Sequence, residues 1–186
     1  MSGASGHPVF ETKSVTVVHD WTYSRLVTRV VSSPQGDEFA RTYVDSPGAV
    51  AIVAVTDEDE IVLVDQYRAT IDCYLTEIPA GMRDKEGEPD IETARRELEE
   101  ETGFRASGWQ PLGRMLSTPG VSNGWVELFL ATGLVHVGAT PDGPEEQSMA
   151  VLRVPFDEAV RMCCESIITD SKSVVGILRA ARVLGR

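Results

Sequence analysis

The stretch Asp90-Ile-Glu-Thr-Ala-Arg-Arg-Glu-Leu-Glu-Glu-Glu-Thr-Gly103 is the part of the chain that decides the fold. Its apolar residues recur at helical spacing and predict one face that packs on a sheet: Ile91, Ala94 and Leu98. Pro89 suits the first turn of such a helix, and Gly103 suits its end. The pattern therefore predicts a helix over residues 91–101.

A stripe of carboxylates lies beside that apolar face, at Glu97, Glu100 and Glu101. Like charges at this spacing repel by roughly 0.2–0.5 kcal/mol per pair, and Arg96 can offset part of this by reaching Glu100. Magnesium prefers carboxylate oxygens, few protein ligands and retained waters, so a hard divalent cation would offset more. From the glutamates alone, a solvated acidic helix face is the simpler interpretation.

The rest of the chain predicts strands first and helices later. Strands are expected at 15–18, 25–31, 38–44, 48–55, 61–64, 126–131 and 151–154, and further helices at 156–165 and 171–184. Residues 61–64 should run back from 48–55 as a hairpin partner. Because helices do not alternate regularly with strands, the fold class is α+β.

Composition excludes several classes of function. Acidic residues outnumber basic ones by 29 to 17, a net charge of −12 that disfavours bulk nucleic acid and anionic lipid as partners. No stretch approaches the roughly 18 apolar residues of a membrane span, and the N-terminus lacks a signal-peptide pattern, so a cytoplasmic location is expected. The three cysteines have no zinc spacing and are expected to be reduced structural thiols: Cys73, Cys163 and Cys164.

Wider context changes the interpretation of the acidic stripe. Gly81, Glu88 and the run Arg96-Glu-Leu-Glu-Glu-Glu-Thr-Gly-Phe104 together resemble the Nudix box, although six residues separate Gly81 from Glu88 where five are usual. The resemblance implies a Nudix-type αβα sandwich around a mixed β-sheet. It also implies an enzyme that uses divalent metal to hydrolyse a diphosphate bond.

Further motifs resemble the ADP-ribose pyrophosphatase branch of this family: Ser46–Val50, Gln66–Arg68, Glu77–Gly81, Ser117–Ser122 and Phe129–Leu134. That branch cleaves ADP-ribose to AMP and ribose 5-phosphate. A diphosphatase for another nucleotide sugar, of the GDP-mannose or ADP-glucose type, is the main alternative, because Asn123-Gly124-Trp125 departs from the branch's acidic or small polar pair. A domain that senses ADP-ribose without cutting it is a third interpretation, which the complete set of box carboxylates disfavours.

The resemblance also implies roles for single residues. Glu97, Glu101 and the backbone carbonyl of Ala80 would be metal ligands, with Glu100 a further ligand or a bridging carboxylate. Two to three Mg²⁺ or Mn²⁺ ions would bind there. Arg96 would orient the carboxylates, and Glu88 would hold the loop and helix together.

The general base is expected in the loop 140–147, with Glu145 the first choice, Glu146 the second and Asp142 the third. Arg68 could grip a phosphate through a bidentate fork, with an ion pair as the alternative. Arg41 matches a family position that reaches the substrate from a second subunit.

The expected organisation is a flexible arm over 1–13, an N-terminal antiparallel β-region over 14–46 and a Nudix hydrolase domain over 47–186. The β-region is expected to form a homodimer and to contact substrate. In it, Trp21 and Tyr23 could stack on adenine, although tryptophan in a β-segment is more often core or interface.

Overall fold

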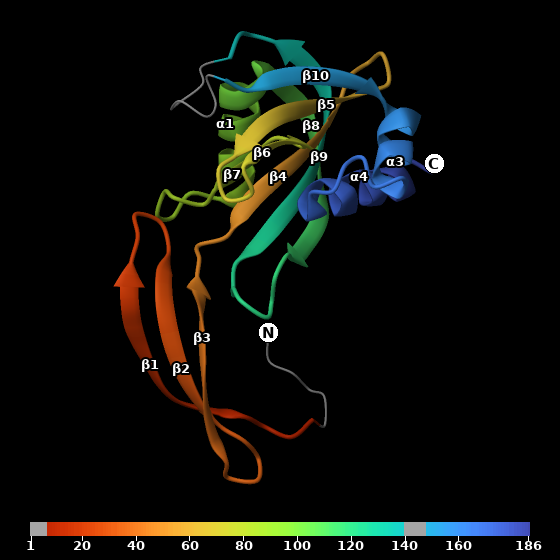
Figure 1. Ribbon diagram of the computed structural model, residues 1–186. Coiled ribbons are helices and arrows are strands. Elements are labelled where there is room, and N and C mark those ends of the chain that lie inside the picture. Colours follow the sequence, from red (N-terminus) through yellow and green to blue (C-terminus); the bar gives the residue numbers. More distant parts are fainter. Residues whose placement is uncertain (1–6, 140–147) are drawn as a thin grey trace. The chain divides into compact units, whose positions relative to one another are not determined.

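The computed structural model describes residues 7–139 and 148–186 (Figure 1). The elements in chain order are β1 (Glu11–Asp20), β2 (Arg25–Ser32), β3 (Glu38–Asp45), β4 (Ala49–Val55), β5 (Glu60–Arg68), β6 (Cys73–Glu77), β7 (Ala80–Met82), α1 (Asp90–Thr102), β8 (Phe104–Leu116), β9 (Trp125–His136), β10 (Ala150–Pro155), α3 (Phe156–Cys164) and α4 (Ser171–Val183). By their contacts the residues form two units, Met1–Pro47 with Thr118–Gly124 and Gly48–Ser117 with Trp125–Arg186. The expected boundary near residue 46 lies beside this division, but the grouping of 118–124 with the N-terminal strands was not anticipated.

The first unit is built on an antiparallel sheet in the order β1-β2-β3. Across β2 and β3, Thr28 pairs with Thr42 and their hydroxyl oxygens lie 2.8 Å apart. The segment 118–124 joins this unit at Val44, whose N–H donates to the carbonyl of Val121 at 2.9 Å. The hydroxyl of Ser122 donates to the carbonyl of Val44 at 3.0 Å.

The predicted arm over 1–13 is too long, because β1 begins at Glu11. Glu11 and Thr12 pair with Ser32 and Val31 of β2, so the ladder extends beyond the apolar residues that predicted a strand. The first four residues of β1, Glu11 to Ser14, are all polar, so they carry no apolar alternation that could have indicated the strand.

The second unit contains a mixed sheet in the order β10-β5-β4-β9-β8, with β6 paired to β5 and β7 to β4. β4 and β9 are parallel, while the other neighbours are antiparallel. The predicted hairpin between β4 and β5 is confirmed, with Val55 opposite Ile61. A parallel central pair is normally covered on both faces, which fits the unbroken apolar run of β4.

Both faces of β4 are indeed buried. Val50, Ile52 and Ala54 pack with residues of α1 in one apolar cluster, and the odd-numbered positions 51, 53 and 55 pack with α3 and α4 in another. Successive side chains of a strand point to opposite faces, so one strand supplies both cores. The result is the αβα sandwich that the resemblance implied, with α1 on one face of the sheet and α3 and α4 on the other (Figure 1).

No helix within residues 7–139 and 148–186 is both long and apolar enough to cross a bilayer. The three cysteines are free thiols, as expected. Cys163 is buried in the core, and this burial raises its pKa to about 11.

Candidate active site

Helix α1 places the acidic stripe against the sheet. It runs over Asp90–Thr102, one residue longer at each end than predicted, and ends at Gly103 with a φ of 73°. Its residues Ala94 and Leu98 are fully buried against β4. This packing turns the neighbouring stripe inward, so Glu97 and Glu101 are only 8% and 5% exposed.

Glu97 lies directly on the backbone of β7. A Cβ atom added at Gly81 would lie 1.9 Å from Cδ of Glu97 and 2.2 Å from each of its carboxylate oxygens. Carbon atoms in contact are normally about 3.5–4.0 Å apart, so only glycine at position 81 allows this approach. The first glycine of the box therefore makes room for one of its carboxylates.

Glu101 binds the same short strand one residue earlier. Its Oε2 accepts a hydrogen bond from the backbone N–H of Ala80 at 3.0 Å. This bond holds the backbone of Ala80 close to the carboxylate of Glu101, as a site that uses both as ligands would require.

Arg96 forms the cationic centre of the stripe. Its Nη1 lies 2.7 Å from Glu97 Oε1 and 2.8 Å from Glu100 Oε2. Its Nη2 lies 3.4 Å from Asp84 and 3.5 Å from Glu88. Burial alone would lower the pKa of Arg96, but Glu97, Glu100 and Glu88 raise that pKa above its ordinary value, so the guanidinium stays charged.

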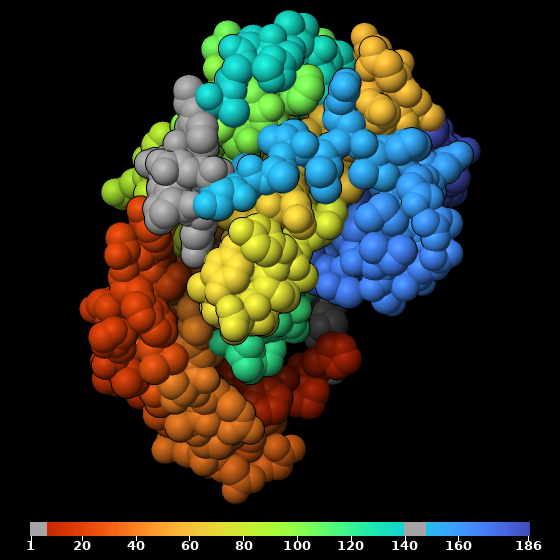
Figure 2. Space-filling model, turned by 45° about the horizontal axis from the view of Figure 1, so that its top comes forward, coloured from red at the N-terminus to blue at the C-terminus, as the bar shows by residue number. Residues whose placement is uncertain are grey.

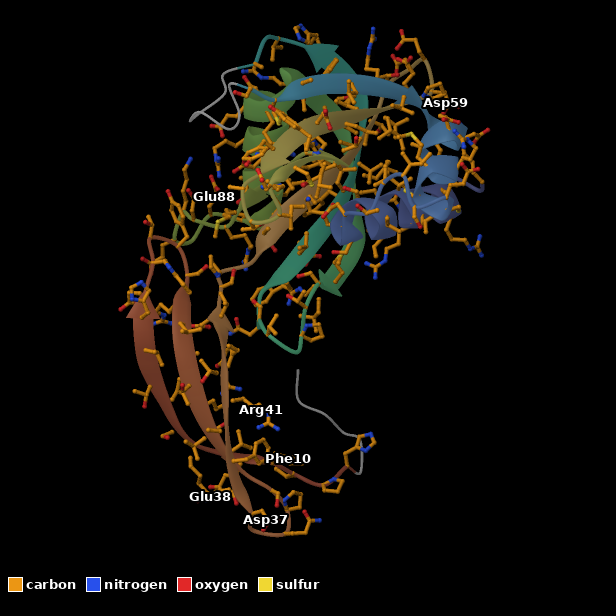
Figure 3. All side chains as sticks on the ribbon, in the orientation of Figure 1. Phe10, Asp37, Glu38, Arg41, Asp59 and Glu88 are labelled. Carbon is orange, nitrogen blue, oxygen red and sulfur yellow. The ribbon has the colours of Figure 1, made fainter. Side chains whose placement is uncertain are left out.

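Glu88 connects the loop before α1 with the helix itself (Figure 3). Its Oε2 accepts a hydrogen bond from the Thr93 hydroxyl at 2.8 Å, besides facing Arg96. The one extra residue between Gly81 and Glu88 therefore does not prevent Glu88 from reaching α1.

The three carboxylates of the stripe do not form one cluster with a common centre. Within the described residues, no three histidine, cysteine or acidic side chains lie close enough to hold an ion between them. Glu97 and Glu100 turn to Arg96, and Glu101 turns to Ala80, because mutually repelling carboxylates take the nearest donors.

The residues present nevertheless fit a hard divalent cation. Glu97 and Glu101 lie against Gly81 and Ala80, so two carboxylates and the backbone of β7 come together at one place. Such a set is all oxygen, and magnesium is commonly bound by one or two carboxylates with waters completing its shell. The surroundings thus suit Mg²⁺ or Mn²⁺ better than a softer metal.

Arg68 forms a bidentate ion pair that sequence reasoning offered only as an alternative. Its Nε and Nη2 donate to the two oxygens of Glu77 at 2.8 and 2.6 Å. Lys172 of α4 also contacts Glu77, which is only 2% exposed. Burial alone would raise the pKa of Glu77, but Arg68 and Lys172 lower the net pKa below its usual value. The guanidinium of Arg68, which was expected to bind a phosphate, thus binds the carboxylate of Glu77.

Sequence reasoning assigned no role to Glu77. Its signal was present, because Glu77 is the last residue of β6 and directly precedes the apolar Ile78-Pro79-Ala80 segment. Buried acidic residues are rare unless they are paired, and here the partners are the two cations just described.

Three residues that were expected to contact substrate belong to the first unit: Arg41, Trp21 and Tyr23. Arg41 lies in β3 with its guanidinium 4.7 Å from the Phe39 ring, which also contacts Phe10 (Figure 3). Trp21 and Tyr23 line a hollow of about 410 Å³ together with the β2 and β3 ends. Both aromatic side chains are exposed, so they are not core residues.

The residues proposed as the general base, Glu145, Glu146 and Asp142, lie outside the described residues.

Comparison with known proteins agrees with this geometry. The NUDIX domain family model matches residues 45–166. An ADP-ribose pyrophosphatase of Mycobacterium tuberculosis is 41% identical over 169 residues, which cover 91% of this chain and 82% of that protein. An ADP-ribose pyrophosphatase of Bacillus subtilis is 35% identical over 152 residues, 82% of each chain.

A solved structure described as an ADP compounds hydrolase superposes with a TM-score of 0.81. It covers 99% of this chain and 97% of its own at 21% sequence identity, a likeness of fold. The domain match spans the strand, loop and helix that bring Gly81, Glu97 and Glu101 together, and this chain is a hydrolase that belongs to the Nudix family.

Proposed function

We propose that the protein hydrolyses the diphosphate bond of a nucleoside diphosphate sugar, and that ADP-ribose, cleaved to AMP and ribose 5-phosphate, is its preferred substrate. The observation that carries the proposal is the seating of Glu97 on Gly81 beside the Ala80–Glu101 hydrogen bond. The two ADP-ribose pyrophosphatases at 41% and 35% identity support the choice of substrate.

Glu97, Glu101 and the carbonyl of Ala80 would hold two to three Mg²⁺ or Mn²⁺ ions, with Glu100 as a further ligand. Such ions neutralise a diphosphate and lower the pKa of a bound water. Arg96 would keep Glu97 and Glu100 oriented through its contacts at 2.7 and 2.8 Å.

Recognition of the nucleoside would fall to the first unit. The rings of Trp21 and Tyr23 lie at a hollow of about 410 Å³, and exposed aromatic rings of this kind can stack on adenine. Arg41 would contact the substrate of a second subunit. Contact of Arg68 with phosphate would need donor atoms beyond the two that bind Glu77.

A substrate panel tests the proposal. Purified protein with Mg²⁺ should release AMP from ADP-ribose faster than it cleaves GDP-mannose or ADP-glucose. EDTA should abolish the activity, and excess Mg²⁺ or Mn²⁺ should restore it. The reason is that negatively charged carboxylates such as Glu97 and Glu100 cannot polarise a phosphorus without a bound cation. Preference for GDP-mannose would move the protein to another branch, and full activity in metal-free buffer would refute the mechanism.

The general base is assigned to Glu145 by the resemblance alone. A base on a loop can approach the attacking water only when substrate is bound, whereas ligands on a helix must hold metal beforehand. Glu145→Gln should therefore lower kcat strongly at neutral pH while Mn²⁺ affinity stays nearly unchanged. If excess Mn²⁺ restores turnover, Glu145 is a ligand instead. If turnover is normal, Glu146 and then Asp142 become the candidates.

Dimerisation is expected through the N-terminal sheet. Exposed apolar side chains gather on β1 and the turn after it: Val15, Val17, Val18, Trp21 and Tyr23. Exposed apolar side chains that gather on one segment often mark a protein–protein interface. Sedimentation should therefore give about twice the chain mass of 20.2 kDa. A strict monomer at micromolar concentration would remove Arg41 from the site.

A further inference from the structure

The first turn of α4 has contacts that exceed helix capping. Asp170 is the N-cap, and its Oδ2 accepts from the Ser173 backbone N–H at 2.9 Å, as a capping residue should. The same oxygen also accepts from the Ser173 hydroxyl at 2.6 Å and from Lys172 Nζ at 3.0 Å. Capping requires only the first of these three bonds.

The Ser173 hydroxyl connects Asp170 to Ile78, which lies just before β7. Because its single hydrogen is donated to Asp170, its oxygen is left as an acceptor, and the backbone N–H of Ile78 donates to it at 2.8 Å. Ser173 is fully buried. A Cβ atom at Gly176, one turn further along α4, would lie 3.0 Å from Cδ1 of Ile78, so the helix approaches this segment closely.

Three successive residues of that segment are held by three different elements. The N–H of Ile78 is bound by Ser173 of α4 at 2.8 Å. The carbonyl of Pro79 accepts from Ile52 of β4 at 2.9 Å, and the N–H of Ala80 donates to Glu101 of α1 at 3.0 Å. Pro79 has no backbone donor, which makes the bond at Ile78 the only N–H anchor between Glu77 and Ala80.

Lys172 fixes the residue before this segment. It contacts the carboxylate of Glu77, which also accepts two hydrogen bonds from Arg68. Figure 2 shows the yellow atoms of the β5–β6 region beside the blue atoms of α4. The turn at 170–173 therefore fixes both the side chain of Glu77 and the backbone of Ile78.

We propose that Ser173, oriented by Asp170, is a positioning residue for the metal site. It fixes Ile78, and through Pro79 it sets the place of the Ala80 carbonyl and of the Glu101 carboxylate bonded to Ala80. This inference rests on the proposed function, since it assigns Ser173 a part in metal binding at Ala80 and Glu101. Residues that orient metal ligands typically change metal affinity or activity by about 10–100-fold when they are replaced.

Ser173→Ala tests the proposal, with Ser171→Ala as its matched control. Ser171 lies in the same turn, undergoes the same chemical change and is exposed. Mn²⁺ binding is measured directly, from the electron paramagnetic resonance signal of free Mn²⁺, at a temperature where circular dichroism shows each variant folded. We expect the Kd for Mn²⁺ to rise on the order of 10-fold in Ser173→Ala and to stay at the parental value in Ser171→Ala.

A merely structural role would lower the melting temperature of Ser173→Ala and leave its Mn²⁺ affinity unchanged, which would overturn the proposal. If Ser173→Ala does not fold, Asp170→Asn decides the question, because asparagine is as good an N-cap as aspartate but holds the Ser173 hydroxyl more weakly. A raised Kd in Asp170→Asn supports the proposal, and a parental Kd overturns it.

Glu101→Gln separates this inference from the proposed function. If the parent binds Mn²⁺ and Glu101→Gln weakens that binding, the metal site stands, and normal binding by Ser173→Ala then rejects only the role of Ser173. If the parent itself does not bind Mn²⁺, both fail together.

Discussion

Glu101→Gln is expected to lower kcat by at least about 10²-fold, equivalent to ~2.7 kcal/mol of transition-state stabilisation. Glu101 is 5% exposed and accepts the Ala80 N–H at 3.0 Å. Glutamine keeps the shape and an acceptor oxygen, so Ala80 should stay in place while the ligand charge is lost. Folding should be retained or improved, because one repelling charge leaves the stripe.

Glu99→Gln is the control for this change. Glu99 lies on the same helix, but its partly exposed side chain pairs with Arg105 at 2.6 Å. Surface ion pairs contribute little to folding stability. The Glu99→Gln variant should therefore stay folded, and its turnover should remain close to that of the parent. Steady-state kinetics at saturating Mg²⁺ distinguish the two variants. Near-normal turnover of Glu101→Gln would mean that Glu101 is not a metal ligand.

Gly81→Ala is the second change with a large expected effect. Its Cβ would lie 1.9 Å from Cδ of Glu97, so the carboxylate must move by more than about 1 Å. Displacements of about 1 Å at a reacting centre can cost about 10²-fold in rate. We therefore expect a comparable loss of kcat/KM together with weaker Mn²⁺ binding.

Urea unfolding checks that Gly81→Ala is folded under assay conditions, and an Mn²⁺ titration separates metal binding from turnover. Glu97→Gln provides the comparison, because it removes the charge of the same carboxylate without crowding it. Both variants should lose Mn²⁺ affinity. Parental affinity and turnover in Gly81→Ala would exclude Glu97 from the metal site.

The sequence predicted α1 and β4 closely because their signals are local. Periodic apolar residues with Pro89 and Gly103 at the ends fixed the helix to within one residue at each end. β8 gave no such signal, since its 13 residues include Gly108, Pro111 and Gly113, and a bulge falls between the last two. Glycine and proline weaken strand patterns, and only pairing with β9 makes this segment a strand.

In the candidate site, too, the features with local sequence signals were predicted, and those that depend on distant contacts were not. The resemblance singled out Gly81, Glu97 and Glu101 because their spacing lies within one loop and one helix. The contacts of Ser173 and Lys172 could not be predicted, because each joins residues 95 positions apart in the sequence. The pairing of Arg68 with Glu77 depends likewise on the β5–β6 hairpin, which no strand pattern indicated.

The parallel pairing of β4 with β9 has a consequence for how the chain reaches its fold. Partners such as Ala49 and Val126 are far apart in the sequence. The chain therefore loses the entropy of closing a long loop before the hydrogen bonds between β4 and β9 can stabilise it. Until β9 docks, β4 presents apolar side chains on both faces, with its edge unpaired. Such a segment is prone to associate between chains, and refolding yield should therefore fall as protein concentration rises.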